Sequence, residues 1–195
     1  MSLRNKKILI DPGHGGKDGG AEGILDGEKV YEKDLALMFA ESVASYIENY
    51  TEATVIMTRD SDVDMGINER WKIGFDNNVD AVISIHWNSH NKKSSGTETI
   101  YAKTRSQDKH FAEVIQNKVV EYLGTNNRGV KDDTKTKVGS LGILRYPSNK
   151  NYPRALVEVE FIDNESAMEA LNRPIYETSL DFATAIKEAL EEYFG

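Results

Sequence analysis

Two of the four histidines in this sequence follow apolar, strand-like runs. His14 comes shortly after the run Lys7–Ile10, and His86 directly follows the run Ala81–Ile85. In α/β proteins, functional groups usually lie just past the carboxyl ends of strands. A single histidine there is more often a hydrogen-bonded structural residue, because burying an unpaired polar group costs about 1–3 kcal/mol. Two histidines that could converge at one sheet edge instead favour a shared ligand such as a metal ion.

A metal site on two imidazoles needs a third donor, and a nearby helix-like segment offers one. Glu32 lies in the first turn of the segment Glu32–Asn49. Two nitrogens and one carboxylate oxygen, with a fourth position left to water, form a recognised catalytic zinc set. Glu28 and Asp34 are competing carboxylates, and an acidic residue at Glu32 could instead only complement the helix dipole. The pattern therefore favours zinc while leaving the third ligand open.

A zinc hydrolase also needs a group that moves protons, and one strand-like run carries two candidates. Alternation in Leu156–Phe161 places Glu158 and Glu160 on one face and apolar side chains on the other. An exposed edge strand would explain both glutamates without any function. The flanking apolar residues are more typical of a core strand, where a carboxylate indicates a site. Its role would be to take a proton from water and return it to a leaving amine.

The glycines around His14 have two interpretations, and several other chemistries are absent. Gly13, Gly15 and Gly16 either permit a tight turn with positive φ or let the backbone approach a ligand closely. The sequence lacks the lysine and hydroxyl of a phosphate loop, the Gly-x-Ser-x-Gly pattern of serine hydrolases and a His-Glu-x-x-His helix. Without cysteine there is no thiolate nucleophile and no disulfide.

Strand-like and helix-like segments alternate along the chain, which predicts an α/β sheet covered on both faces within a single domain. The strand-like runs are Lys7–Ile10, Val55–Met57, Ala81–Ile85, Thr97–Ala102, Leu141–Tyr146 and Ala155–Phe161. The segments with helical spacing are Glu32–Asn49, Asn68–Phe75, Phe111–Leu123 and Ser179–Phe194. The polar stretch Thr125–Lys137 is expected to be a surface loop that could border a site.

Bulk properties are those of an ordinary soluble domain. The chain has 195 residues, of which 39% are hydrophobic and 29% charged. Its net charge of −8 argues against a nucleic-acid partner, because nucleic-acid-binding proteins usually carry a basic face. No apolar run approaches the ~20 residues of a membrane span. We expect a monomer, with residues 1–6 as an N-terminal extension in which Met1-Ser2-Leu3 comes from a vector.

The order and spacing of these segments resemble the zinc-dependent N-acetylmuramoyl-L-alanine amidases of bacterial autolysins, sporulation amidases and phage endolysins. The resemblance runs from Lys7 to Phe194. It rests on Ile10-Asp11-Pro12-Gly13-His14-Gly15-Gly16, Glu32-Lys33-Asp34, Thr58-Arg59-Asp60 with Glu69-Arg70, Asp80 through Ser84-Ile85-His86 and Asn88, and Ala155-Leu156-Val157-Glu158 with Phe161-Ile162 and Asn164.

The resemblance implies one catalytic domain over residues 1–195, with a central, mostly parallel, six-stranded sheet flanked by helices on both faces. It implies that His14, Glu32 and His86 hold one zinc ion and that Glu158 is the catalytic acid and base. The substrate would be peptidoglycan of the cell wall, outside the cell, cut between N-acetylmuramic acid and L-alanine. An inactive peptidoglycan-binding module and a zinc peptidase acting elsewhere on the stem peptide are the alternatives.

Two residues beside the expected site depart from the family pattern. Glu160 stands where the family usually has glycine, and Trp87 stands where it usually has a small residue. Both substitutions bear on the shape of the groove, and Glu160 could compete with Glu158 as proton shuttle. His90 is expected to be a loop residue and His110 a surface residue.

Three further charged residues of the resembling segments have a structural interpretation. We expect Arg59, Glu69 and Arg70 to form an ion-pair network and not to contact substrate.

Overall fold

Short apolar runs that are buried on both faces form the centre of the sheet. In β1 (Lys7–Pro12), Leu9 packs on one side and Ile10 on the other, and both are fully buried. β5 (Ala81–Asn88) and β8 (Arg154–Phe161) are likewise buried on both faces. This pattern is typical of parallel strands that are covered on two sides.

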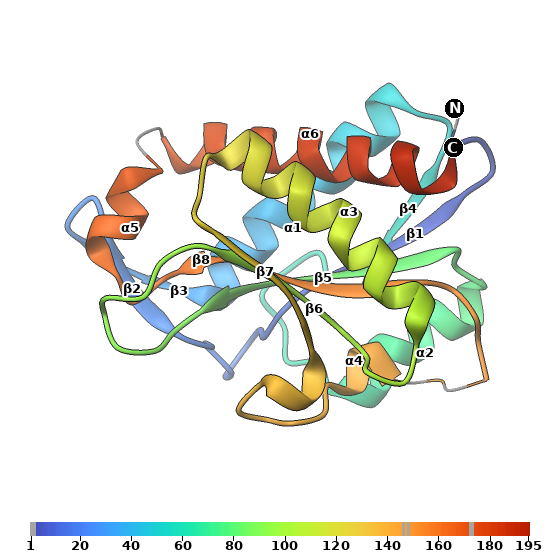
Figure 1. Cartoon of the computed structure of the whole chain (residues 1–195), viewed down its shortest axis with the longest axis horizontal. Coiled ribbons are helices and arrows are strands. Elements are labelled where there is room, and N and C mark those ends of the chain that lie inside the picture. The colour runs from blue at the N-terminus through green and yellow to red at the C-terminus, as the bar shows by residue number, and fades with distance from the viewer. Residues whose placement is uncertain (1–2, 146, 148, 172–173) are drawn as a thin grey trace.

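The central sheet has six strands in the order β4-β1-β5-β8-β6-β7 (Figure 1). The remaining strands are β4 (Thr54–Met57), β6 (Thr97–Tyr101) and β7 (Asn127–Asp132). Neighbouring strands are parallel except for β6 and β8, which are antiparallel. The structure is a computed structural model that describes residues 3–145, 147, 149–171 and 174–195. The predicted α/β class with a mostly parallel six-stranded sheet is confirmed.

Helices cover both faces of this sheet (Figure 1). α1 (Glu32–Tyr50), α3 (Ser106–Leu123) and α6 (Ile175–Phe194) pack on one face and enclose the larger hydrophobic cluster. α2 (Ile67–Asn77) and the short α4 (Gly142–Arg145) pack on the other face around a smaller cluster. Among the described residues, we find no helix with both the length and the apolar character that a membrane span requires.

α1 shows how the sequence produces these layers. Leu35, Phe39, Val43 and Ile47 recur every four residues, so they lie on one face of the helix, and each is at most 3% exposed. Fully burying a side chain of this size stabilises the fold by roughly 1.5–3 kcal/mol. The apolar face therefore fixes the helix against the sheet and, with it, the position of the first-turn residues.

The run Leu141–Tyr146, predicted as a strand, is wrong. Residues Gly142–Arg145 form α4, in which Ile143 and Leu144 are buried in the smaller cluster. Tyr146 lies outside the described residues. A short apolar run does not by itself distinguish a buried strand from a turn of buried helix, because both need only a few consecutive apolar residues.

The stretch Thr125–Lys137, predicted as a surface loop, contains two regular elements. β7 pairs in parallel with β6 as an edge strand, and a 3₁₀ turn (Asp133–Lys135) follows it. Edge strands are often polar and charged, which removes the alternation that would reveal them in a sequence. The hairpin of β2 (Glu22–Leu25) and β3 (Glu28–Tyr31) and the short α5 (Glu165–Ala170) were also not predicted.

The N-terminal segment is more closely packed than expected. Leu3 is 1% exposed and belongs to the larger cluster, and its carbonyl accepts a hydrogen bond from the Lys6 N–H. Met1 and Ser2 lie outside the described residues. Leu3 is therefore part of the packed domain and not of a free extension.

The prediction that Glu158 and Glu160 share one face of a strand is wrong, because β8 contains a bulge. His86 pairs with Glu158 but Asn88 pairs with Phe161, so β8 has one more residue than β5 in this interval. Such a bulge redirects the side chains that follow it. Glu158 lies on the side of the smaller cluster, whereas Glu160 borders the α3 and α5 side. β8 is an interior strand, which also removes the edge-strand explanation of the two glutamates.

Glu160 has a structural partner set of its own. Its Oε1 accepts hydrogen bonds from the N–H groups of Gly96, at 2.5 Å, and Phe161, at 2.8 Å. The side chain is buried, and burial raises its pKa. Glu160 therefore ties the loop before β6 to the bulge.

We expect Glu160→Ala to lower the free energy of unfolding by about 1–3 kcal/mol, because two buried N–H groups would lose their acceptor. Glu160→Gln should retain most of the stability, since its amide oxygen can still accept. Urea denaturation measures both effects. Glu28→Ala, at an exposed hairpin position, serves as the control and should change stability by less than about 0.5 kcal/mol. An Ala variant as stable as the control would contradict this role.

Candidate functional site

The carboxyl ends of β1 and β5 bring the two predicted histidines together. The strands are parallel neighbours, and the Gly13 N–H continues their pairing by donating to the Ile85 carbonyl at 2.9 Å. The ring centroids of His14 and His86 are 5.0 Å apart. Glu158 lies beside His86 on the adjacent β8. The expected convergence at one sheet edge is thus present.

Glu32 lies between the two imidazoles. Its Oε1 is 2.8 Å from His86 Nδ1 and 3.1 Å from His14 Nε2, and it accepts a further hydrogen bond from the Trp87 N–H at 3.1 Å. Its Oε2 accepts from the Ala21 N–H at 2.8 Å. The ligand atoms of His14, Glu32 and His86 all lie within 4.8 Å of one another. We call these three residues the triad.

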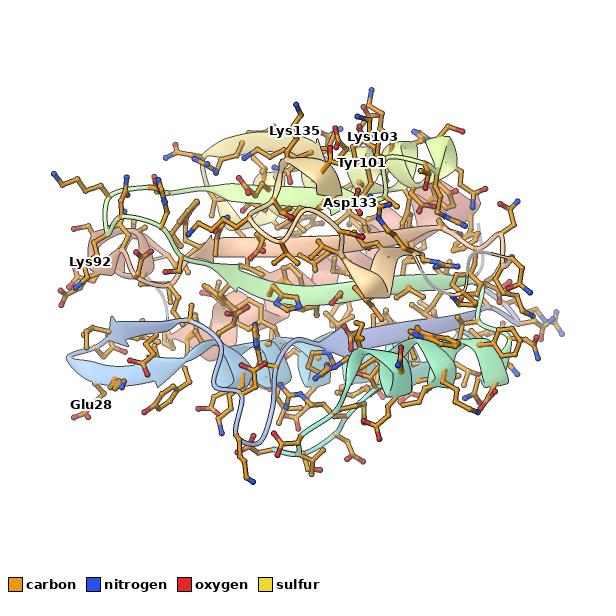
Figure 2. All side chains as sticks on the ribbon, turned by 90° about the horizontal axis from the view of Figure 1, so that it is seen from below. Glu28, Lys92, Tyr101, Lys103, Asp133 and Lys135 are labelled. Carbon is orange, nitrogen blue, oxygen red and sulfur yellow. The ribbon has the colours of Figure 1, made fainter. Side chains whose placement is uncertain are left out.

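The competing carboxylates are placed elsewhere. Asp34 is exposed on α1, and Glu28 is exposed on the β2–β3 hairpin. Figure 2 shows Glu28 at the outer tip of this hairpin, pointing into solvent. Among the described residues, the only cluster of three metal-ligating side chains is the triad.

Asp18 orients one of the imidazoles. Its Oδ2 lies 2.9 Å from His14 Nδ1, which leaves Nε2 facing Glu32. A carboxylate on the second ring nitrogen is the usual partner of a metal-binding histidine, because it fixes the ring and its tautomer. Sequence reasoning did not identify Asp18, and its position four residues after His14 is a weak signal.

Both interpretations of the glycines hold, at different positions. Gly15 and Gly16 have positive φ values of 132° and 58°. Gly13 instead permits a close approach, since a Cβ there would lie 2.3 Å from His86 Cε1. His14 itself has φ 58°, a left-handed conformation that is uncommon for residues other than glycine.

Two buried arginines hold this unusual turn. Arg59 donates to the carbonyls of Pro12 and Gly13, and Arg70 donates to the carbonyls of Pro12 and His14. Arg70 also pairs with the buried carboxylate of Asp11 at 2.9 Å. Both arginines therefore have a structural role at this turn.

The predicted ion-pair network is only partly present. Among the described residues, Arg70 of this set forms an ion pair, with Asp11, whereas Arg59 donates to backbone carbonyls. Glu69 accepts from the Gly66 N–H at 2.7 Å, at the start of α2.

The electrostatics of the triad favour positive charge at its centre. Burial opposes ionisation of His14, but the hydrogen bonds and negative charges of Glu32 and Asp18 together outweigh burial and raise the pKa of His14 to about 9. The pKa of His86 is raised in the same way, again by Glu32 against burial. The pKa of Glu32 is lowered by both imidazoles despite burial. The site thus stabilises a carboxylate that attracts cations.

The donor set fits zinc. Two imidazole nitrogens and one carboxylate oxygen converge from the turn after β1, from β5 and from α1, and zinc takes these ligand types in catalytic sites that keep one position open. The three ligand atoms lie within 4.8 Å of one another, so a single divalent cation could bind to all of them. A metal site with thiolate ligands is excluded because the chain has no cysteine.

Glu158 lies beside the triad, and its carboxyl group has a raised pKa. Burial raises its pKa to about 7, with His86 opposing the shift. Its Oε2 is buried and has no hydrogen-bond partner among the described residues. A carboxyl group with a pKa near neutrality can both accept and donate a proton, which general acid–base chemistry requires.

The triad and Glu158 line one cavity of about 520 Å³. Its other wall carries Glu98, Arg128 and Lys131, which sequence reasoning did not identify. Arg128 and Lys131 fall in the stretch that was expected to border a site.

The remaining predicted residues lie around this cavity or away from it. Trp87 is 1% exposed and packs against Phe39 with ring centroids 5.1 Å apart, while its backbone supports Glu32. His90 lines the cavity from a loop but is outside the triad. His110 is exposed, as predicted.

Comparison with known proteins decides the family. Residues 8–192 match the family described as N-acetylmuramoyl-L-alanine amidase. The chain belongs to this amidase family. It is similar to the germination-specific N-acetylmuramoyl-L-alanine amidase of Bacillus subtilis strain 168, with 31% identity over 209 residues that cover 100% of this chain and 82% of that protein.

Solved amidase structures share the fold. The catalytic domain of CwlV, an N-acetylmuramoyl-L-alanine amidase from Bacillus (Paenibacillus) polymyxa var. colistinus, superposes with a TM-score of 0.83 and 30% identity over 97% of this chain and 98% of that domain. An uncharacterized cell wall amidase of Bacillus anthracis is 32% identical over 206 residues, 98% of this chain. The chain spans only 36% of that relative's length.

We expect Gly13→Ala to weaken zinc binding by roughly tenfold or more, because the new Cβ would displace the His86 ring. Competition with a chromogenic chelator measures the affinity. Gly66→Ala is the matched control, since its Cβ would meet only the flexible end of Glu69 at 3.2 Å. Equal affinity in the two variants would show that the close approach of Gly13 is not needed.

Glu158 should make the stability of the metal-free protein depend on pH. Its folded pKa of about 7 lies above the ordinary value of 4.5, so its contribution to stability is present below pH 4.5 and is lost as pH rises to about 7. Chelator-treated Glu158→Gln should match the parent near pH 4.5 and exceed its unfolding free energy near pH 8 by on the order of 2–3 kcal/mol. Urea denaturation at both pH values measures this. A constant difference would contradict the raised pKa.

Proposed function

We propose that this chain hydrolyses peptidoglycan at the amide bond between the lactyl group of N-acetylmuramic acid and L-alanine, using one zinc ion. The observation that carries the proposal is the convergence of His14, Glu32 and His86 in one cavity with Glu158. Membership of the amidase family supports the choice of bond. The substrate places its site of action at the cell wall.

The residues divide the chemistry between them. Zinc held by His14, Glu32 and His86 would polarise the scissile carbonyl and bring the pKa of a water molecule to roughly 7. Glu158 accepts the proton of the attacking water and delivers it to the departing amine. The C–N bond breaks as a C–O bond forms, leaving a carboxylate on the lactyl group and a free amino group on L-alanine.

Glu158 is the better shuttle of the two glutamates. It lines the cavity of the triad, whereas the Glu160 carboxylate is held by two backbone N–H groups outside that cavity. The bulge in β8 therefore separates a reactive carboxyl group from a structural one.

The complete set of side chains also argues against the first alternative, an inactive binding module. A module that only holds peptidoglycan needs neither the triad nor a buried carboxyl group with a raised pKa. A zinc peptidase acting elsewhere on the stem would use the same residues, so the identity of the new amino terminus separates it from an amidase.

We expect zinc-loaded protein to clear a suspension of purified cell walls and to expose new L-alanine amino termini. A chelator should abolish both signals and added zinc should restore them. Another new amino terminus would indicate a peptidase, and no clearing would indicate a binding module.

Glu158→Gln should keep stoichiometric zinc and lose activity by about 10²-fold or more, because the proton shuttle is gone. Elemental analysis and the cell-wall assay measure the two properties. Glu160→Gln, on the same strand, is the matched control and should retain activity within a few-fold. Loss of activity in the control alone would assign the shuttle to Glu160.

A further inference from the structure

The wall of the cavity opposite the triad gathers positive charge on an otherwise acidic chain. Arg128, Lys131, Lys135 and Lys137 line this wall, although the whole chain has a net charge of −8. Glu98 is the acidic residue among them, and the other two lining carboxyl groups belong to the triad and to Glu158. A wall with this excess of positive charge is suited to bind an anionic ligand.

Arg128 is held in a fixed orientation. Its Nε donates to Glu98 Oε2 at 2.6 Å, and its guanidinium lies over the Phe161 ring, 4.7 Å from the centroid. Glu98 is itself fixed, since Oε1 accepts from Asn88 Nδ2 at 3.1 Å and its side chain is 9% exposed. Nη1 also donates to the Ser95 carbonyl at 3.5 Å, which leaves the N–H groups of Nη2 suited to bind a carboxylate.

Glu98 does not neutralise this wall. Lys131 Nζ donates to the same Oε2 at 2.5 Å, so two cations share one carboxylate. Lys135 and Lys137 are exposed and form no ion pair with any residue that the structure describes. The wall therefore keeps net positive charge.

The turn that carries these lysines is anchored. Asp133 is fully buried and accepts hydrogen bonds from Arg145 and from the N–H of Lys103. Figure 2 shows Asp133 and Lys135 close together at the rim, with the Lys135 side chain extending outward into solvent. Lys135 and Lys137 thus add positive charge at the exposed part of the wall, while the side chains of Arg128 and Lys131 form its half-buried part.

The distance between the triad and this wall determines which residue of a bound peptide would lie against the wall. His86, Glu158 and Glu98 are paired in a row across β5, β8 and β6. With strands about 4.8 Å apart, Glu98 lies about 10 Å from His86. An extended peptide covers about 3.3–3.6 Å per residue, so the wall faces the second or third residue beyond the cleaved bond.

We propose that Arg128, supported by Lys131, binds a free carboxylate on the stem peptide of the substrate, two or three residues from the scissile amide. This subsite rests on the proposed function, because the triad sets the position of the cleaved bond. Arg128 is accordingly a specificity-determining residue that favours acidic over amidated stem peptides.

Binding of small muramyl peptides tests the subsite without requiring turnover. Zinc-loaded Glu158→Gln is titrated calorimetrically with muramyl-L-alanyl-D-isoglutamate and with its isoglutamine amide. A second pair of tripeptides carries diaminopimelate or lysine at the third residue. We expect roughly tenfold tighter binding of the acidic member of one pair, and the pair that shows it identifies the residue.

Arg128→Gln in the same background should abolish this preference, and Arg128→Lys should retain part of it. The side chain is 33% exposed, so the variants should fold, and thermal melting checks this. Lys103→Gln is the matched control, because it removes an exposed cation outside the cavity wall and should leave the preference unchanged.

The outcomes separate this subsite from the proposed function. Equal binding within both pairs, or no binding at all, overturns the subsite even if the parent protein exposes L-alanine termini. A preference that survives Arg128→Gln also overturns it. A preference lost in Arg128→Gln supports the subsite even if the parent protein proves to cut another bond.

Discussion

The structure depends on one buried carboxylate that two imidazoles approach at once. Glu32 Oε1 lies within 3.1 Å of nitrogen atoms of both His14 and His86. Three polar groups gathered in a largely buried place are stable only if their charges and lone pairs are matched. The lowered pKa of Glu32 and the raised pKa values of the histidines express this matching. A cation would complete the arrangement, which is why we interpret the cluster as a metal site.

The residues around the triad fix the positions of its three side chains. Gly13 leaves room for the His86 ring, and Arg59 and Arg70 hold the carbonyls of the turn that gives His14 its left-handed backbone. α1 fixes Glu32 through its buried apolar face. The energy that maintains the unusual turn therefore comes from buried hydrogen bonds and packing around it.

Much of this arrangement could be predicted from the sequence, because the triad lies at the ends of strongly apolar elements. His14, His86 and Glu32 each adjoin a run whose periodicity is plain, and parallel strands bring their ends together. The bulge in β8 could not be predicted, since its sequence alternates as a regular strand does, and so Glu160 was placed on the wrong face. β7 was missed because its polar edge lacks alternation. The cationic wall could not be predicted either, because its charges gather around Glu98 only once β7 is paired with β6.

The single antiparallel pairing in the sheet has a consequence for how such a domain can diversify. Because β6 runs against β8, one half of the rim consists of strand ends and the other half of strand beginnings. The first half carries the triad and Glu158, while the second carries Glu98 and Arg128 near the starts of β6 and β7. Mutation can therefore remodel the second half while leaving the reactive half intact, so that selectivity and chemistry evolve as separable modules on one scaffold.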